Sequence, residues 1–218
     1  VGVVTFAGED RLLLDPADRD LDLDEDDLRA LAERDAALVV PLTRDYDAAI
    51  RSLDELSGTA GSGMTDFAAG IVRATVELAR LEGAESEARE DAERVIYFLT
   101  DGKPRLPYDR EKARRAARRA AGLAARHDVR IHSFALGKDA VTGRLSRTVQ
   151  RIARETGGAC VELENPAEIV PLLRATALSF VDRVKIVNRT TGEETDYVTT
   201  GIDGSFYGEI PLAEGENE

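Results

Sequence analysis

Short apolar segments alternate with longer amphipathic segments along most of the chain. Val95–Thr100 is the most apolar strand-like segment, and apolar residues occupy both of its alternating sets of positions. A continuous apolar run of this length is typical of a central parallel strand whose two faces are covered by helices. We therefore expect this segment to lie in the middle of a sheet.

The other apolar segments predict further strands, and segments with apolar residues at helical spacing predict the helices between them. Pro41 marks the second strand as an edge strand, because proline cannot donate a hydrogen bond to a neighbouring strand. The predicted strands are Val1–Phe6, Ala36–Thr43, Val95–Thr100, Val129–Leu136 and Gly158–Leu163. The predicted helices are Tyr46–Leu56, Asp66–Leu81, Arg110–Arg126, Leu145–Glu155 and a helix that begins at Asn165-Pro166.

The order of these elements predicts an α/β fold. From Val95 to Ala177, strand and helix alternate three times, which is typical of a doubly wound, mostly parallel, Rossmann-like sheet flanked by helices. After Phe180 the pattern changes to short strands, which make a poor independent domain. We expect an α/β domain over residues 1–178 and the start of a β-sandwich-like module over residues 179–218, truncated at its end. The strands of this second part are Val181–Asn188, Thr195–Thr200 and Ser205–Leu212.

Composition narrows the classes of partner. The chain has 29 basic and 42 acidic residues, a formal charge of −13, and such a surface repels phosphate backbones, so we expect no nucleic-acid partner. No apolar run approaches the roughly 18–20 residues that a membrane span needs. Cys160 is the only cysteine, so an internal disulfide is impossible.

Candidate chemistry lies at the carboxyl end of Val95–Thr100. Asp101 and Gly102 follow this strand directly, and in open α/β sheets ligands bind outside the carboxyl ends of the strands. An Asp-Gly turn is the plainer interpretation, but such turns usually join hairpin strands, whereas this segment leads to a helix. Thr65 ends a glycine-rich loop before another helix, which either Thr65 or Asp66 can cap. A carboxylate, a hydroxyl and water are hard oxygen ligands that suit Mg²⁺.

Taken in order over residues 1 to about 177, these segments resemble a von Willebrand factor type A domain. That family carries a metal-ion-dependent adhesion site built from three loops. Thr65 matches the threonine of the second loop, and Asp101 matches the aspartate of the third. The resemblance implies that Thr65 and Asp101 are metal ligands. It also implies a set of ligand-binding loop residues, namely Gly61, Ser62, Gly63, Asp66 and Gly102.

One part of the family's pattern has no counterpart in this sequence. In the family, a central first strand is followed by an Asp-x-Ser-x-Ser motif, and these 218 residues contain no such motif. Because the chain opens as a strand already under way, we expect both ends to be truncated and the first strand to lie upstream of Val1. Without this first strand, the sheet has a gap between Val1–Phe6 and Val95–Thr100. Without the motif that follows it, only two ligand residues, Thr65 and Asp101, remain. The alternative is a re-closed sheet with a degenerate site.

The resemblance implies a non-enzymatic, metal-ion-dependent module for protein binding or cell adhesion. We expect Mg²⁺, or Mn²⁺ or Ca²⁺, to bind this chain weakly or not at all on its own. The implied partner is a protein that offers an acidic side chain to the metal. A bacterial extracellular, cell-surface or periplasmic setting is expected, with a cytoplasmic one left open. Two alternatives stay open: a metal-dependent hydrolase using the same strand end, and an intracellular adaptor of a chaperone-like ATPase.

Other polar clusters have simpler interpretations. The stretch from Glu9 to Arg34 is strongly acidic, and its alternating aspartates fail as a calcium-binding EF-hand loop because Leu23 stands where glycine is needed. We interpret them as a solvated insertion. Cys160 lies in a predicted strand, where a role in the core is the simpler account. His132 also lies in a predicted strand, and with only two histidines, neither near a matching nucleophile, we expect no hydrolytic triad. The arginines of the helix Arg110–Arg126 fall opposite its alanine stripe and predict a solvated face.

Overall fold

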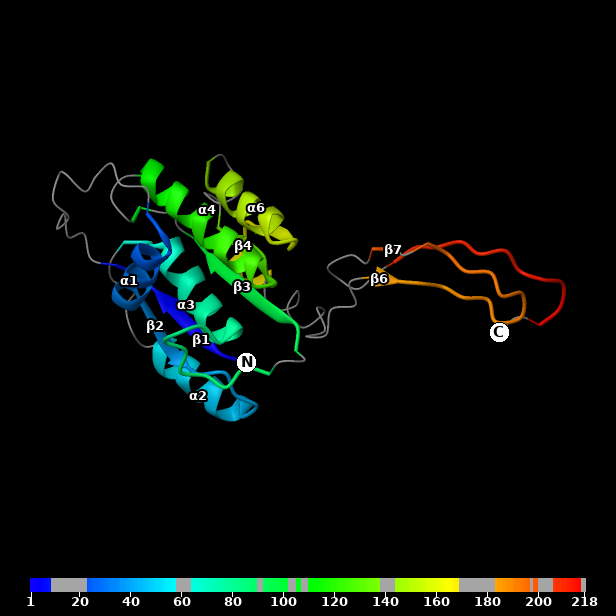
Figure 1. Cartoon of the computed structure of the whole chain (residues 1–218), viewed down its shortest axis with the longest axis horizontal. Helices are drawn as coiled ribbons and strands as arrows, with labels where there is room; N and C mark the ends of the chain where they lie inside the picture. Colours follow the sequence, from blue (N-terminus) through cyan, green and yellow to red (C-terminus); the bar gives the residue numbers. More distant parts are fainter. Residues whose placement is uncertain are drawn as a thin grey trace. The chain divides into compact units, whose positions relative to one another are not determined.

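The chain forms two compact units, Val1–Asn165 and Pro166–Glu218. The structure is a computed structural model that describes residues 1–8, 23–57, 64–89, 92–101, 105–106, 110–137, 144–168, 183–196, 198–199 and 206–216. Figure 1 shows that the helices and the longer strands belong to the first unit. The boundary expected from the sequence, between residues 178 and 179, lies outside the described residues.

The predicted helices and strands of the first unit are present, with ends shifted by at most three residues. The strands are β1 (Val3–Phe6), β2 (Ala36–Val40), β3 (Arg94–Thr100), β4 (Val129–Leu136) and β5 (Cys160–Leu163). The helices are α1 (Glu25–Asp35), α2 (Tyr46–Ser57), α3 (Phe67–Ala79), α4 (Arg110–Arg126) and α6 (Arg144–Glu155).

The described strands of the first unit form two sheets. β3, β4 and β5 make a parallel sheet with β4 in the middle, in which Ile96 lies opposite Ile131. β1 and β2 make a separate antiparallel pair, in which Phe6 lies opposite Ala36. The coarse prediction of a mixed α/β fold with a parallel sheet is confirmed. Within the described residues, however, β1 and β3 are not hydrogen-bonded to each other, so the sheet is interrupted between them.

Helix α3 connects the two sheets. It packs against β1 and β2 on one side of the interruption and against β3 on the other. Its first residue, Phe67, lies edge-on to Phe6 of β1 and to Phe98 of β3, with ring centroids 6.3 Å and 4.9 Å away. The rings of Phe6 and Phe98 stack at 5.3 Å. This aromatic triad of Phe6, Phe67 and Phe98 therefore joins β1 to β3 by side-chain contact.

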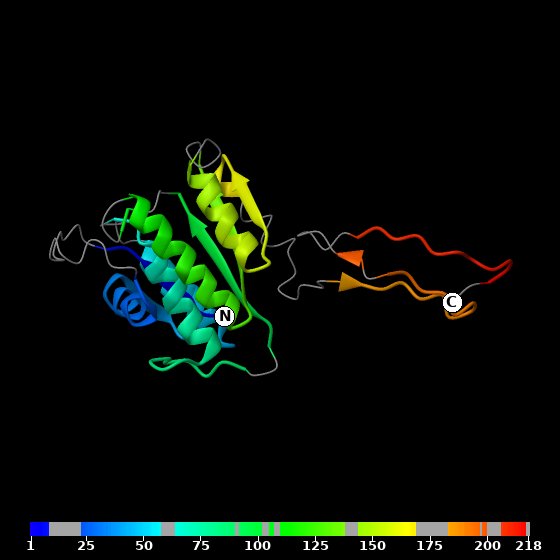
Figure 2. The same cartoon turned by 45° about the horizontal axis from the view of Figure 1, so that its top comes forward.

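The helices cover one face of β3. Ile96 and Phe98 belong to the same buried cluster as residues of α3, α4 and α6, and Figure 2 shows these three helices side by side over the sheet. Alternate residues of a strand point to opposite faces. On the other face of β3, Tyr97 is half-buried and Leu99 is 38% exposed. The prediction that both faces of this strand are covered is therefore wrong for the described residues, because the three helices pack on the same side.

Helix α1 was not predicted, because the acidic stretch that contains it was interpreted as a solvated insertion. Its start is fixed by a capping box, in which Asp24 Oδ1 accepts from Asp27 N at 2.9 Å and Asp27 Oδ2 accepts from Asp24 N at 3.0 Å. Leu28, Leu31 and Ala32 are buried in the main core, and α1 packs against α3. Three apolar residues at helical spacing were the available signal among many charged ones.

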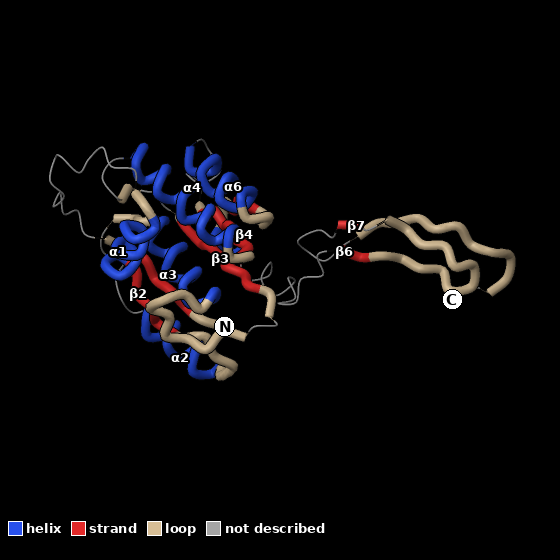
Figure 3. Tube along the Cα trace, in the orientation of Figure 1, coloured by secondary structure: helices blue, strands red, loops and turns tan. Residues whose placement is uncertain are grey.

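The second unit contains little regular structure in its described residues, as Figure 3 shows. Strands β6 (Arg183–Val184) and β7 (Val198–Thr199) pair antiparallel. Asn188 organises the turn between them, because its Oδ1 accepts from Thr190 N and Thr191 N, and its Nδ2 donates to the Pro211 carbonyl. Two of the three predicted strands are thus present in shortened form, whereas residues 206–212 are not assigned to a strand.

Candidate functional site

Backbone hydrogen bonds bring the end of β1, the start of α3 and the segment after β3 together. Gly8 lies just beyond β1 and exchanges two hydrogen bonds with Met64, at 2.8 Å and 2.6 Å. The carbonyl oxygen of Thr65 accepts from Arg105 N at 2.9 Å and from Leu106 N at 3.2 Å. The amino end of α3 therefore lies at the carboxyl ends of strands, where open α/β sheets bind ligands.

The two expected metal ligands lie on these linked segments. Thr65 is half-buried and directly precedes α3. Asp101 follows the buried Thr100 at the end of β3 and is exposed to solvent. The carbonyl oxygen of Thr65 is bonded to Arg105 N and Leu106 N, whereas residues 102–104, between Asp101 and Arg105, lie outside the described residues. Of the expected loop residues, Gly61, Ser62, Gly63 and Gly102 lie outside the described residues, and Asp66 is the fifth.

Asp66 is a fully buried carboxylate with an unpaired oxygen. It is the N-cap of α3, and its Oδ1 accepts from Ala69 N at 3.0 Å. Its Oδ2 is buried and has no hydrogen-bond partner among the residues that the structure describes. Burial raises the pKa of Asp66 to about 6; the hydrogen bond from Ala69 N opposes this rise, and the nearby Asp35 carboxylate adds to it. The folded state therefore holds this group at a free-energy cost when it is ionised.

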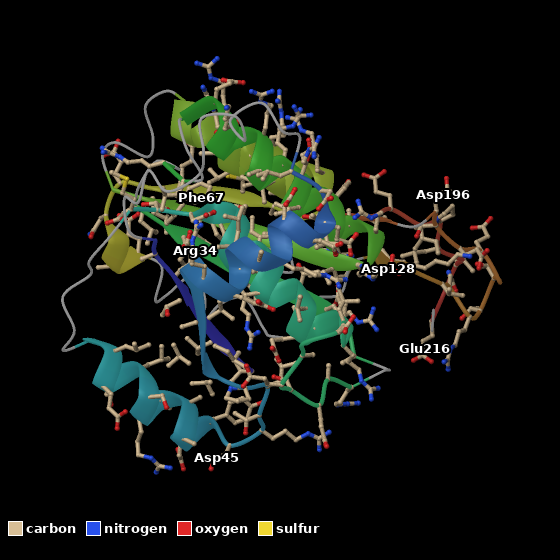
Figure 4. The ribbon with its side chains drawn as sticks, turned by 60° about the vertical axis from the view of Figure 1, so that its left-hand side comes forward. Arg34, Asp45, Phe67, Asp128, Asp196 and Glu216 are labelled. Atoms are coloured by element: carbon tan, nitrogen blue, oxygen red, sulfur yellow. The ribbon has the colours of Figure 1, made fainter. Side chains whose placement is uncertain are left out.

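Asp35, the last residue of α1, lies near Asp66 and next to Gly8. The Asp35 carboxylate is buried and receives Arg34 Nε at 2.8 Å and Arg34 Nη2 at 2.5 Å. Figure 4 shows Arg34 and Phe67 at the same end of the unit. A Cβ atom at Gly8 would overlap Leu106 Cδ1 and lie 2.8 Å from Asp35 Cγ, so a larger residue there requires these side chains to shift. Sequence patterns do not single out Gly8 and Asp35, because nothing local distinguishes an aspartate that becomes buried from its acidic neighbours.

Thr65 and Asp101 alone offer too few ligands for a cation. Mg²⁺ takes six oxygen ligands in near-octahedral geometry and keeps several waters. Within the ranges that the structure describes, no three His, Cys, Asp or Glu side chains lie close enough together to hold a metal ion. The oxygen chemistry of a hydroxyl and a solvent-exposed carboxylate fits a hard cation, but the rest of the coordination shell has to come from elsewhere.

His132 and Cys160 occupy structural positions in the parallel sheet. His132 Nδ1 accepts from Ala159 N at 3.1 Å, and the ring stacks on Tyr97 with centroids 5.7 Å apart. Burial lowers the pKa of His132, so the imidazole is neutral at neutral pH. Burial raises the pKa of the Cys160 thiol to about 11, which keeps it protonated. Neither group is in the ionisation state of a charged acid or a thiolate nucleophile.

Comparison of this chain with protein-family models, with curated proteins and with solved structures gives no match. No helix among the described residues is long and apolar enough to cross a membrane. The residues at the ends of β1, α3 and β3 are therefore the features from which a function can be inferred.

Proposed function

We propose that this chain is a metal-ion-dependent protein-binding module. Its cation site lies at the carboxyl ends of β1 and β3, with Thr65 and Asp101 as ligands, directly or through water. The observation that carries this proposal is the pair of hydrogen bonds from Arg105 N and Leu106 N to the Thr65 carbonyl. These bonds fix the backbone at Thr65 against residues 105–106, which follow Asp101 in the chain.

The interruption of the sheet supports an incomplete site. β1 and β3 both pack under α3 and are joined by the aromatic triad, yet their backbones are not paired with each other in the described residues. Unpaired strand edges readily pair with a further strand. In this proposal, one strand fills the space between β1 and β3, and the loop that follows it carries the Asp-x-Ser-x-Ser motif of von Willebrand factor type A domains.

A bound divalent cation would supply an open coordination position for an acidic side chain of a partner protein. Asp101 suits the role of a metal ligand because its side chain is exposed, so a cation reaches it without unfolding of β3. The start of α3, capped by Asp66, fixes the backbone at Thr65. A bacterial cell-surface or exported setting belongs to the same proposal, since the sequence after Phe180 is expected to be the start of a β-sandwich-like module.

The test compares metal binding by this chain with binding by a version extended upstream by about 40–50 residues, enough for one strand and one helix. Isothermal titration calorimetry with MgCl₂ and MnCl₂ is expected to show weak or no binding to the present chain and saturable binding to the extended one. Asp101→Asn and Thr65→Ala in the extended version are each expected to weaken binding at least tenfold.

Asp47→Asn is a matched control, because Asp47 is also exposed but lies on α2. It should leave the affinity for either cation unchanged. The proposal fails if the extended version binds neither Mg²⁺ nor Mn²⁺, or if Asp101→Asn binds both cations as tightly as the unmodified protein.

A further inference from the structure

Positive charge is concentrated on two helices of an otherwise acidic protein. The chain has 29 basic and 42 acidic residues. Helices α4 and α6 hold 11 of these basic residues and two of the acidic ones, Glu111 and Glu155, which leaves 18 basic and 40 acidic residues elsewhere. The two helices thus have a net charge of +9, and the rest of the chain has a net charge of −22.

Helices α4 and α6 are neighbours in the fold and expose their basic residues together. Arg118 Nε of α4 lies 3.3 Å from Glu155 Oε1 of α6. The buried sides of both helices are mainly apolar and face the sheet. Figure 4 shows nitrogen-tipped side chains gathered on the outer side of these helices. We call their exposed arginines the basic face, which consists of Arg115, Arg118 and Arg126 of α4 and Arg147, Arg151 and Arg154 of α6.

The basic face forms two rows, one along each helix. In α6 its residues follow i, i+4, i+7 spacing, and in α4 they span three helical turns, so each row lies along one side of its helix. At 1.5 Å of rise per residue the rows are roughly 16 Å long in α4 and roughly 10 Å long in α6. Packed helices lie about 8–10 Å apart. The basic face therefore has the length and width of a short helical segment.

Internal ion pairs use only part of this charge. Arg118 pairs with Glu155, and Arg126 pairs with Glu25 of α1 at 3.0 Å. Like charges in close proximity repel, so a solvated face explains the exposure of these arginines but not their concentration on two adjacent helices. The members of the basic face that have no ion-pair partner among the described residues are Arg115, Arg147, Arg151 and Arg154.

We propose that the basic face docks an acidic helical segment of a partner protein, with carboxylates about one helical turn apart. Guanidinium groups bind carboxylates through two parallel hydrogen bonds, which gives geometric specificity as well as attraction. Because the field of charges is screened beyond about 8–10 Å, a short segment on the basic face experiences mainly the arginines. DNA or an anionic bilayer extends beyond the basic face. It is therefore repelled by the rest of the chain, which has a net charge of −22.

The probe is a fluorescein-labelled, alanine-based helical peptide with glutamates once per turn along one face, titrated with the protein and followed by fluorescence anisotropy. We expect saturable binding that weakens as salt is raised. The variant Arg147→Glu/Arg151→Glu is expected to weaken binding at least tenfold. The control variant Arg44→Glu/Arg51→Glu changes the net charge equally at exposed positions outside the basic face, and it should change the affinity by less than twofold.

Three results would overturn this proposal. Equal weakening by both double variants would assign the binding to net charge, and equal binding of a scrambled peptide of the same composition would remove the spacing requirement. Tighter binding of a labelled oligonucleotide, or of vesicles containing anionic lipid, would replace the protein partner by another polyanion. Circular dichroism of each variant verifies that it is folded. If Arg147→Glu/Arg151→Glu is unfolded, Arg115→Ala/Arg154→Ala takes its place. Peptide binding should persist in EDTA, which separates this surface from the proposed cation site.

Discussion

Helix α3 has a buried carboxylate at each end, and the two are satisfied very differently. Glu77, near the carboxyl end, is 2% exposed, accepts hydrogen bonds from Glu85 N and Ser86 N, and pairs with Arg73 at 3.1 Å. Asp66, at the amino end, is fully buried, accepts one hydrogen bond from Ala69 N and keeps Oδ2 unpaired. One helix thus holds a carboxylate whose oxygens are both paired and a carboxylate with one unpaired oxygen.

The difference separates a structural anchor from a strained site. Glu77 ties the loop after α3 to the helix, and Ser86 of that loop extends the network, because its Oγ accepts from Leu42 N at 2.9 Å. Asp66 adjoins the expected metal ligand Thr65, and its missing partner leaves an electrostatic cost in the folded state. Proteins retain such costs mainly at functional sites, where stability is traded for binding.

The largest effect is expected at the anchor. Glu77→Gln removes the charge that faces Arg73 and directs an amide group toward backbone N–H groups. Breaking a buried ion pair from one side typically destabilises a protein by about 3–5 kcal/mol, and we expect a loss in this range, measured by urea unfolding. Glu85→Gln is the control, because Glu85 pairs with the same arginine but is 66% exposed, and it should lose less than about 1 kcal/mol. Equal losses in the two variants would contradict the anchor role.

At the opposite end of α3, removal of the buried charge is expected to stabilise the protein. Asp66→Asn keeps a carbonyl oxygen for Ala69 N and removes the buried charge, so it should stabilise the protein at pH 7, by up to about 3 kcal/mol at 1.36 kcal/mol per pKa unit. The folded-state pKa of about 6 lies above the ordinary value of 3.8. The ionisation cost is therefore absent below about pH 4, grows between about pH 4 and pH 6, and is fully present above pH 6. The stability difference between variant and unmodified protein should vanish at pH 4, and a difference independent of pH would contradict the buried-charge account.

The close approach of Gly8 to Asp35 and Leu106 predicts an intermediate loss of stability when Gly8 is replaced. A Cβ there would overlap Asp35 and Leu106, so Gly8→Ala should destabilise the protein by about 1–3 kcal/mol in thermal or urea unfolding. Gly122→Ala is the matched control within α4, where a Cβ meets no atom within 4 Å, and it should stabilise by about 0.5–1 kcal/mol. If Gly8→Ala proves neutral, the contact of Gly8 with Asp35 is looser than the distances indicate.

The smallest effect on stability is expected at Asp101. Its side chain is exposed, and surface substitutions usually change the free energy of unfolding by less than about 0.5 kcal/mol. Asp101→Asn should therefore unfold at the same urea concentration as the unmodified protein, although it is expected to weaken cation binding at least tenfold in the extended version. A large loss of stability would show that Asp101 supports the fold instead of serving a ligand.

Sequence patterns predicted individual elements far better than the relations between them. The bounds of α4 and β4 were predicted correctly, because an alanine stripe and a dense apolar strand give strong periodic signals. Helix α1 was missed, since its few apolar residues stand among acidic ones. Of the candidate site, Thr65, Asp66 and Asp101 were found because each lies at the end of a predicted element. Gly8 and Asp35 reach that place only through the fold.

The sequence by itself determined most of the helices and strands of the first unit, the residues at their ends and the acidic excess. Only the tertiary structure decided that aromatic contact joins β1 to β3, that an oxygen of Asp66 is buried without a partner and that α4 and α6 form one basic face. The physical reason is that periodicity reports which side of an element is buried but not which residues cover it. Desolvation and charge interactions depend on distances between residues that are remote in sequence, and folding alone sets those distances.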